Sequence, residues 1–149
     1  MMRYLAIDLG DKRTGLAVGD DETRIASPLE VVTAPIERVE GLIEAVARAA
    51  AAHDAGALVI GLPLNMDGTE GPRAKAVRAF ASRLGGAVAL EIYFVDERLS
   101  SAQADWSMAR SGLTRGQKKN RRDAMAAAVI LRTFFTSRGE TGGSEERVR

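Results

Sequence analysis

The chain has 149 residues, of which 46% are hydrophobic and 28% are charged, and its formal net charge is +1. This length and balance are typical of one globular domain, which buries about two thirds of the surface that its unfolded chain exposes. The absence of cysteine excludes disulfides and thiolate metal sites and favours a cytoplasmic location. No apolar run reaches the ~20 residues of a transmembrane helix, and we expect no signal peptide. A net charge this small means that a nucleic-acid partner has to be argued from local clusters.

The N-terminal part of the chain predicts three strands joined by short turns. Residues 4–9 and 14–18 are apolar runs on either side of the charged turn 10–13. Residues 25–32 form a third extended segment, which we expect to bend at Ser27–Pro28 because proline donates no ladder hydrogen bond. Short connections of this kind predict an antiparallel meander.

Helices and strands alternate in the middle of the chain. Apolar residues recur at intervals of three and four in residues 36–53, which predicts an amphipathic helix. The apolar run 57–62 predicts a strand buried on both faces. A second helix is expected from Pro72 to the glycine pair Gly85–Gly86, and residues 87–95 predict a further strand. Strands connected through helices join a sheet in parallel, so these two are expected to be parallel strands.

The C-terminal part predicts two helices and a tail. A capping-box pattern begins a helix at Ser100 that runs to about residue 110, and the last helix runs from about Lys118 to Ser137. Residues 139–149 consist mainly of Gly, Thr, Ser, Glu and Arg and predict a disordered tail. The whole pattern predicts one α/β domain over residues 1–138, with a mixed five-stranded sheet flanked by helices.

Three short regions place an acidic residue where buried structure is expected to meet a cleft. Asp8 lies in the first strand, Asp96 and Glu97 close the last strand, and Asp123 opens the last helix on its apolar face. Sites in sheets with parallel strands gather beyond the carboxyl ends of the strands. Carboxylates without cysteine or histidine are oxygen ligands suited to Mg²⁺ or Mn²⁺. Two such ions would support hydrolysis of a phosphodiester bond.

Each acid also has a purely structural interpretation. Asp8 is satisfied if turn amides, Lys12 or Arg13 bind its carboxylate. Glu97 is explained as the ion-pair partner of Arg98 or Lys12. Asp123 is explained as a first-turn acid, because helix N-termini attract negative charge. Each of these interpretations is simpler than catalysis when taken alone, and the joint placement of the three acids favours a site.

Two segments are candidates for contact with a phosphate backbone. The first is the stretch 110–122, which contains cations and no acid, namely Arg110, Arg115, Lys118, Lys119, Arg121 and Arg122. The second is the loop that leads from the fourth strand into the next helix, where amides and side chains can meet a phosphate. Its candidate contacts are Asn65, Thr69 and Arg73. The structural alternatives are a solvated basic loop and glycines that simply form a turn.

Four motifs in this order resemble the YqgF/RuvX family, from the first strand to about Phe135. They are Asp8-Leu-Gly-x-Lys-Arg-Thr-Gly-Leu-Ala-Val, Gly61-Leu-Pro-Leu-Asn-Met-Asp-Gly-Thr-Glu-Gly, Asp96-Glu-Arg-Leu-Ser and Asp123-Ala-x-Ala-Ala-x-x-Ile-Leu. Members of this family are described as nucleases of precursor ribosomal RNA and as Holliday junction resolvase-like proteins. The resemblance implies an RNase H-like fold and a cytoplasmic nuclease in 5′-end processing of pre-16S rRNA.

The resemblance also implies roles for individual residues. Asp8, Glu97 and Asp123 correspond to the catalytic, metal-binding acids, with Mg²⁺ or Mn²⁺ as the cofactor. Glu97 is preferred to Asp96 because strand alternation puts the two on opposite faces, and the equivalent residue in resolvases is typically a glutamate. The expected substrate contacts are Lys12, Arg13, Asn65, Thr69, Arg73, Arg98, Lys118, Lys119, Arg121 and Arg122. The expected partner is precursor rRNA, with the ribosome as a further candidate.

Other functions are compatible with the same residues. The chain is also a candidate resolvase of branched DNA, although the fourth acid of many resolvases is missing and Ala126–Ala128 stands in that turn. A nucleic-acid-binding assembly factor with little hydrolysis is a second alternative. The glycine-containing turn after Asp8 also resembles the phosphate loop of an actin-like ATPase, but such enzymes need two lobes and this chain supplies one.

Overall fold

The structure is a computed structural model and describes residues 1–99, 115–138 and 146–147. The helix predicted from Ser100 to about residue 110 lies outside the described residues. Of the predicted tail, only Glu146 and Arg147 are described.

One mixed sheet forms the centre of the molecule, and its strand order is β3-β2-β1-β4-β5-β6. The first three strands are antiparallel neighbours, and β4 and β5 run parallel to β1. The predicted five-stranded arrangement is therefore confirmed for β1 to β5. The bounds are β1 Arg3–Asp8, β2 Arg13–Asp20, β3 Ala26–Thr33, β4 Ala57–Leu62, β5 Glu91–Asp96 and β6 Glu146–Arg147.

Two features of the sheet edges bear on the predictions. The register between β2 and β3 shifts between Leu16 and Ala17, which pair with Glu30 and Pro28. This irregularity falls where Pro28 predicts a bend, because proline cannot continue a regular ladder. At the other edge β6 pairs antiparallel with β5. These two residues of the C-terminal segment thus form a short strand, where composition alone predicts disorder.

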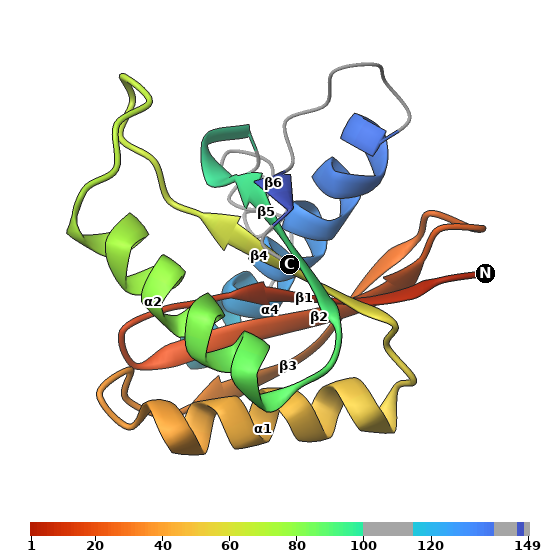
Figure 1. Cartoon of the computed structure of the whole chain (residues 1–149), viewed down its shortest axis with the longest axis horizontal. Helices are drawn as coiled ribbons and strands as arrows, with labels where there is room; N and C mark the ends of the chain where they lie inside the picture. Colours follow the sequence, from red (N-terminus) through yellow and green to blue (C-terminus); the bar gives the residue numbers. More distant parts are fainter. Residues whose placement is uncertain (100–114, 139–145, 148–149) are drawn as a thin grey trace.

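Three helices within the described residues cover the sheet from two sides. They are α1 Val39–Ala52, α2 Pro72–Ala87 and α4 Arg115–Arg138, and the short 3₁₀ helix η1 spans Glu97–Leu99. Figure 1 shows α1 and α2 on one face and α4 on the other. None of the described helices is long and apolar enough to cross a membrane.

Two helix boundaries differ from the sequence prediction. α2 continues through Gly85 and Gly86 to Ala87 instead of stopping at the glycine pair. Space is open around Gly86, and a helix tolerates glycine at a cost of about 1 kcal/mol when its neighbours are packed. The last helix begins at Arg115, earlier than the apolar periodicity indicates. Asp123 is therefore not in its first turn.

Strand alternation divides the core between the two faces. On β1, Leu5 and Ile7 are buried against α1 and α2, whereas Tyr4 and Ala6 are buried in the cluster formed with α4. Side chains two residues apart share a face. Asp8 continues the series of Tyr4 and Ala6, so its side chain lies on the face that α4 covers.

The backbone of α4 passes very close to β2. A Cβ atom on Gly15 would overlap the carbonyl oxygen of Asp123 and lie 3.0 Å from the backbone nitrogen of Ala124. Only glycine leaves room for backbone to approach backbone in this way. Gly15 faces Asp8 across the β1–β2 ladder, so this approach brings Asp123 to the end of β1.

Candidate functional site

The acids gather at the carboxyl ends of the parallel strands. Asp8 is the last residue of β1, and Glu97 follows directly after Asp96, the last residue of β5. β4 lies between these two strands. Its Leu62 pairs with Asp96 and opens the loop that leads into α2. This is the edge at which sheets with parallel strands collect functional groups.

Asp8 and Glu97 form a carboxyl pair. Burial is the largest influence on Asp8 and raises its pKa to about 9, and a hydrogen bond to Glu97 and the charges of Glu97 and Asp123 act in the same direction. In the metal-free protein Asp8 is therefore protonated at neutral pH and donates this hydrogen bond to Glu97. Two carboxylates this close cannot both remain charged without a cation.

Asp123 stands beside this pair and is bound by Arg13. The Nε of Arg13 lies 3.1 Å from Oδ2 of Asp123, and both side chains are about a quarter exposed, at 28% and 27%. Because α4 begins at Arg115, the interpretation of Asp123 as a first-turn acid is wrong. Arg13 thus neutralises Asp123 next to the carboxyl pair, and its role as a substrate contact stays a prediction.

Asp96 and Glu97 have different partners. The guanidinium of Arg98 binds both oxygens of Asp96, with Nε 3.0 Å from Oδ1 and Nη2 2.6 Å from Oδ2. This bidentate contact holds the pKa of Asp96 below its ordinary value. Glu97 instead contacts Asp8. Of the two neighbouring acids, Glu97 is the one that reaches the end of β1.

Gly61 makes the room that Glu97 occupies. A Cβ atom on Gly61 would lie 2.6 Å from Cδ1 of Ile130 and 2.9 Å from Cγ of Glu97. This role was missed in the sequence. The available signal was a glycine within an otherwise apolar buried strand, which indicates that something approaches the backbone closely.

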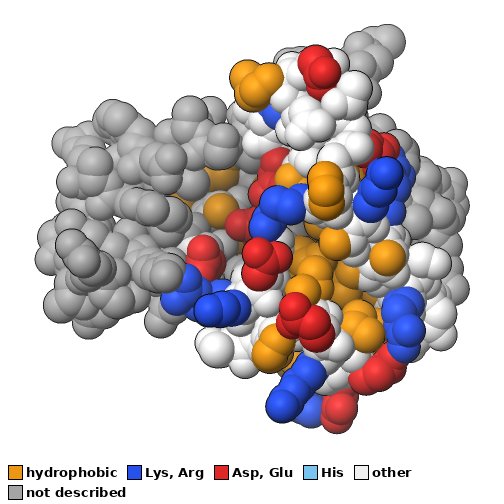
Figure 2. Space-filling view, turned by 90° about the vertical axis from the view of Figure 1, so that its left-hand side faces the viewer, with side chains coloured by type: hydrophobic (Ala, Val, Ile, Leu, Met, Phe, Trp, Pro, Cys, Tyr) orange, Lys and Arg blue, Asp and Glu red, His pale blue; other side chains and the backbone are white. Residues whose placement is uncertain are grey.

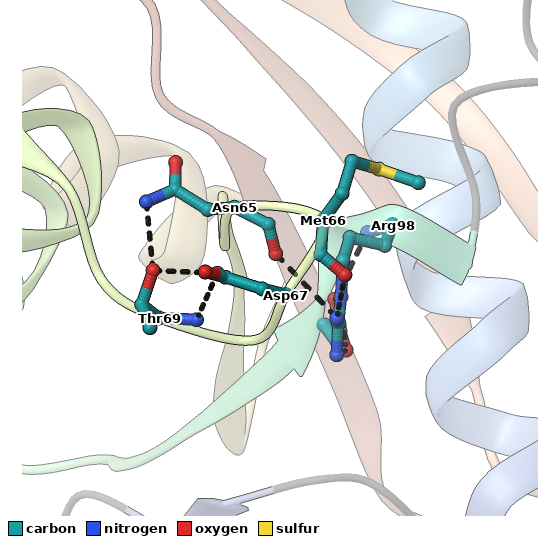
Figure 3. A network of polar contacts seen from close by, with 6 residues as sticks. Asn65, Met66, Asp67, Thr69 and Arg98 are labelled. Carbon is teal, nitrogen blue, oxygen red and sulfur yellow. Dashed lines mark hydrogen bonds and ion pairs between the residues drawn. The ribbon is translucent and has the colours of Figure 1, made fainter.

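The loop between β4 and α2 is held by its own side chains (Figure 3). Asn65 Nδ2 donates to Oγ1 of Thr69 at 2.9 Å, and that hydroxyl donates to Asp67 at 2.6 Å. Arg98 donates to the main-chain oxygen of Met66 at 3.1 Å. Asn65 and Thr69 therefore stabilise the loop, and their role as substrate contacts stays a prediction.

The other predicted contacts fall into two groups. Arg73 reaches back to the β1–β2 turn, where it lies 3.4 Å from Asp11 and from the carbonyl oxygen of Leu9, and Lys12 is exposed on the same turn. The side chains of Lys118, Lys119, Arg121 and Arg122 lie outside the described residues. Among the described residues, Figure 2 shows acidic and basic side chains interspersed on the face that carries the β1–β2 turn and α2.

The carboxyl pair suits a divalent cation. Asp8 and Glu97 offer oxygen ligands only, and a bound cation would favour the charged form of Asp8, which burial and the neighbouring acids disfavour. Mg²⁺ is commonly held by one or two carboxylates together with phosphate oxygens and water. No three described acids or histidines stand together as a preformed metal site. Asp123 would have to turn from Arg13 to become a third ligand.

The raised pKa of Asp8 predicts how stability depends on pH. Its pKa is 3.8 in a model compound and about 9 in the folded protein, so the folded state binds the extra proton between these values. The free energy of unfolding of the metal-free protein should therefore fall as pH rises, by at most about 1.4 kcal/mol per pH unit from this group. Urea titrations in EDTA at about pH 6 and about pH 8 measure the slope. The raised pKa of Asp8 would be contradicted if the wild-type protein became more stable as pH rose over this range and Asp8→Asn did not.

Solved structures define the class of fold. Thermus thermophilus RuvC in complex with a Holliday junction substrate is similar with a TM-score of 0.62 and 16% identity, over 99% of this chain and 100% of that chain. The fowlpox virus resolvase in complex with junction DNA is similar with a TM-score of 0.53 and 11% identity, over 93% and 100%. The fold is thus RNase H-like, as in these resolvases.

The family follows from the sequence match. Residues 2–137 match the family model described as RuvX, Holliday junction resolvase, and the chain belongs to this family. A relative from Anaeromyxobacter sp. (strain K) is 43% identical over 92% of this chain and 98% of its own length. One from Methylocella silvestris is 46% identical over 87% and 79%. Both carry the name "Putative pre-16S rRNA nuclease".

Proposed function

We propose that this protein is a metal-dependent endonuclease that hydrolyses phosphodiester bonds in precursor 16S rRNA during 5′-end processing in the cytoplasm. The observation that carries the proposal is the buried carboxyl pair of Asp8 and Glu97 at the carboxyl ends of β1 and β5. The names of the relatives favour precursor 16S rRNA as the substrate. The resolvase neighbours share the fold, which is compatible with a nucleic-acid substrate.

The proposed roles of the residues follow from their positions. Asp8 and Glu97 would hold Mg²⁺ or Mn²⁺ through their carboxylate oxygens, with Asp123 as a further ligand. A bound cation would supply charge stabilisation at the scissile phosphate and a water molecule of lowered pKa. Asp8 would have to be deprotonated to act as a ligand. Arg13 limits the negative charge at Asp123, and Lys12 is exposed on the adjacent turn, where a phosphate oxygen can reach it.

Glu97→Gln tests this proposal. The substitution keeps the size of the side chain and removes its charge, so cleavage in Mg²⁺ or Mn²⁺ should fall by about a hundredfold or more. The matched control is Glu44→Gln on α1, which alters an exposed carboxylate paired with Arg48 and should leave cleavage unchanged. Both variants and the wild type are incubated with labelled precursor 16S rRNA and with a four-way DNA junction.

The substrates separate the alternatives. Cleavage of the RNA and not of the junction supports the proposal, whereas cleavage of the junction alone would assign the chain to branched DNA. Equal, metal-independent behaviour of wild type and Glu97→Gln would overturn the nuclease mechanism. Tight binding of RNA without cleavage would then identify an assembly factor that binds without hydrolysis.

A further inference from the structure

Met66 is the most exposed of the large hydrophobic side chains that the structure describes. Its side chain is 88% exposed, compared with 65% for Ile25. It lies in the loop between β4 and α2, which projects from the body of the molecule in Figure 1. A single exposed apolar residue needs no explanation by itself. Met66 differs from such a residue because its loop is ordered and contacts the candidate site.

The loop holds Met66 in one place. The amide of Gly68 donates to the carbonyl oxygen of Asn65 at 2.8 Å, and the amide of Asn65 donates to that of Thr69 at 2.9 Å. Arg98 fixes the carbonyl oxygen of Met66 itself. A contact residue that is already ordered loses less entropy when it binds a partner.

Met66 is also connected to the candidate site through a hydrogen bond. Arg98, which binds its carbonyl oxygen, is the residue after Glu97 and is anchored on Asp96. The loop leaves β4 just after Gly61, whose missing Cβ makes room for Glu97. Figure 3 shows the Met66 side chain pointing away from the polar network, so its thioether is free to meet a ligand.

The chemistry of the loop favours a base over a phosphate. Asp67 follows Met66, and hydrogen bonds from Thr69 hold the pKa of Asp67 below its ordinary value, so it is charged at neutral pH. A carboxylate repels a phosphate backbone. Two cations contact the loop and both bind carboxylates, since Arg98 is engaged by Asp96 and Arg78 by Glu70. What remains at the tip is an apolar, adaptable thioether, the kind of group that packs on or between bases.

We propose that Met66 packs against an unpaired nucleobase next to the scissile phosphate and so favours single-stranded over fully paired substrate at the cut. This inference rests on the proposed nuclease function. It assigns the selection of unpaired nucleotides to the loop between β4 and α2, separately from the carboxyl pair that supports hydrolysis.

The test compares Met66→Ala with Met66→Leu and with Ile25→Ala as a matched control. Ile25 is an exposed hydrophobic residue of similar size in the turn before β3, outside the site. Affinity for single-stranded RNA is measured by fluorescence anisotropy with each substitution added to Asp8→Asn, which prevents cleavage. Met66→Ala should weaken binding about tenfold, which corresponds to about 1.4 kcal/mol, whereas Met66→Leu and Ile25→Ala should not. Binding to a fully paired duplex should not change.

A set of oligonucleotides with one abasic nucleotide at successive positions locates the contact. At one position the abasic oligonucleotide should bind equally to Asp8→Asn proteins with and without Met66→Ala, because the base that Met66 contacts is absent. If the wild-type chain cuts RNA and Met66→Ala binds single strands as tightly as Ile25→Ala, the inference is wrong and the nuclease proposal stands. If the wild-type chain neither binds nor cuts RNA, both are wrong.

Discussion

Asp8→Asn is expected to make the metal-free protein more stable and to abolish its activity. Burial and the neighbouring charges raise the pKa of Asp8, so this carboxyl must take up a proton when the wild-type chain folds at neutral pH. The amide avoids that cost, and the free energy of unfolding should therefore rise by about 1–3 kcal/mol. Cleavage should fall by about a hundredfold or more because a metal ligand is lost. A gain in stability with a loss of activity is common when a substitution removes a functional residue that destabilises the fold.

Calorimetry in EDTA and in Mg²⁺ checks this prediction. The Tm of Asp8→Asn should exceed that of wild type in EDTA. Added Mg²⁺ should raise the Tm of wild type and leave that of Asp8→Asn unchanged, since a ligand that binds only the folded state stabilises it. Glu44→Gln serves as the control and should behave as wild type in both conditions. A Tm of Asp8→Asn below that of wild type in EDTA would contradict the assigned state of Asp8.

Gly15→Ala is expected to be the most destabilising single-methyl change in the described core. The added Cβ would overlap the carbonyl oxygen of Asp123, and both sides of this contact are backbone. Neither can yield without separating β2 from α4, so the free energy of unfolding should fall by about 3 kcal/mol or more. Urea denaturation measures the loss, and any folded fraction should bind metal weakly because Asp123 has moved.

Gly41→Ala is the matched control for this substitution. Gly41 lies in α1 with nothing within 4 Å of its added Cβ. Alanine should stabilise the protein there by about 0.5–1 kcal/mol through its higher helix propensity. Equal, small effects of the two substitutions would show that the approach of α4 to β2 is looser than the structure has it.

Local pattern was enough to predict most of the fold and the position of the acids. Strand alternation and helical periodicity predict β1 to β5, α1 and α2, because these elements bury one face or stripe against a shared core. The first strand, with Asp8 in its apolar run, already indicates a strand-end carboxylate. The preference for Glu97 over Asp96 agrees with the observed contact between Glu97 and Asp8.

What the sequence could not predict depends on contacts between distant segments. The ion pair of Arg13 with Asp123 needs α4 to cross β2 at Gly15, and no local pattern specifies that crossing. The sequence also does not show that Asn65 and Thr69 are hydrogen-bonded to each other, because that contact depends on how the loop folds. The early start of α4 was missed because its first residues, 115–122, carry charge and little apolar periodicity.

Single-turnover cleavage of precursor 16S rRNA is the strongest test of the proposed nuclease mechanism. Wild type and Asp8→Asn are compared at equal concentrations of folded protein, in Mn²⁺ and in EDTA, on RNA that spans the 5′ end of the mature sequence. We expect wild type to cleave the RNA in Mn²⁺ and not in EDTA, and Asp8→Asn to cleave it in neither condition. Cleavage by Asp8→Asn at the wild-type rate would contradict this mechanism.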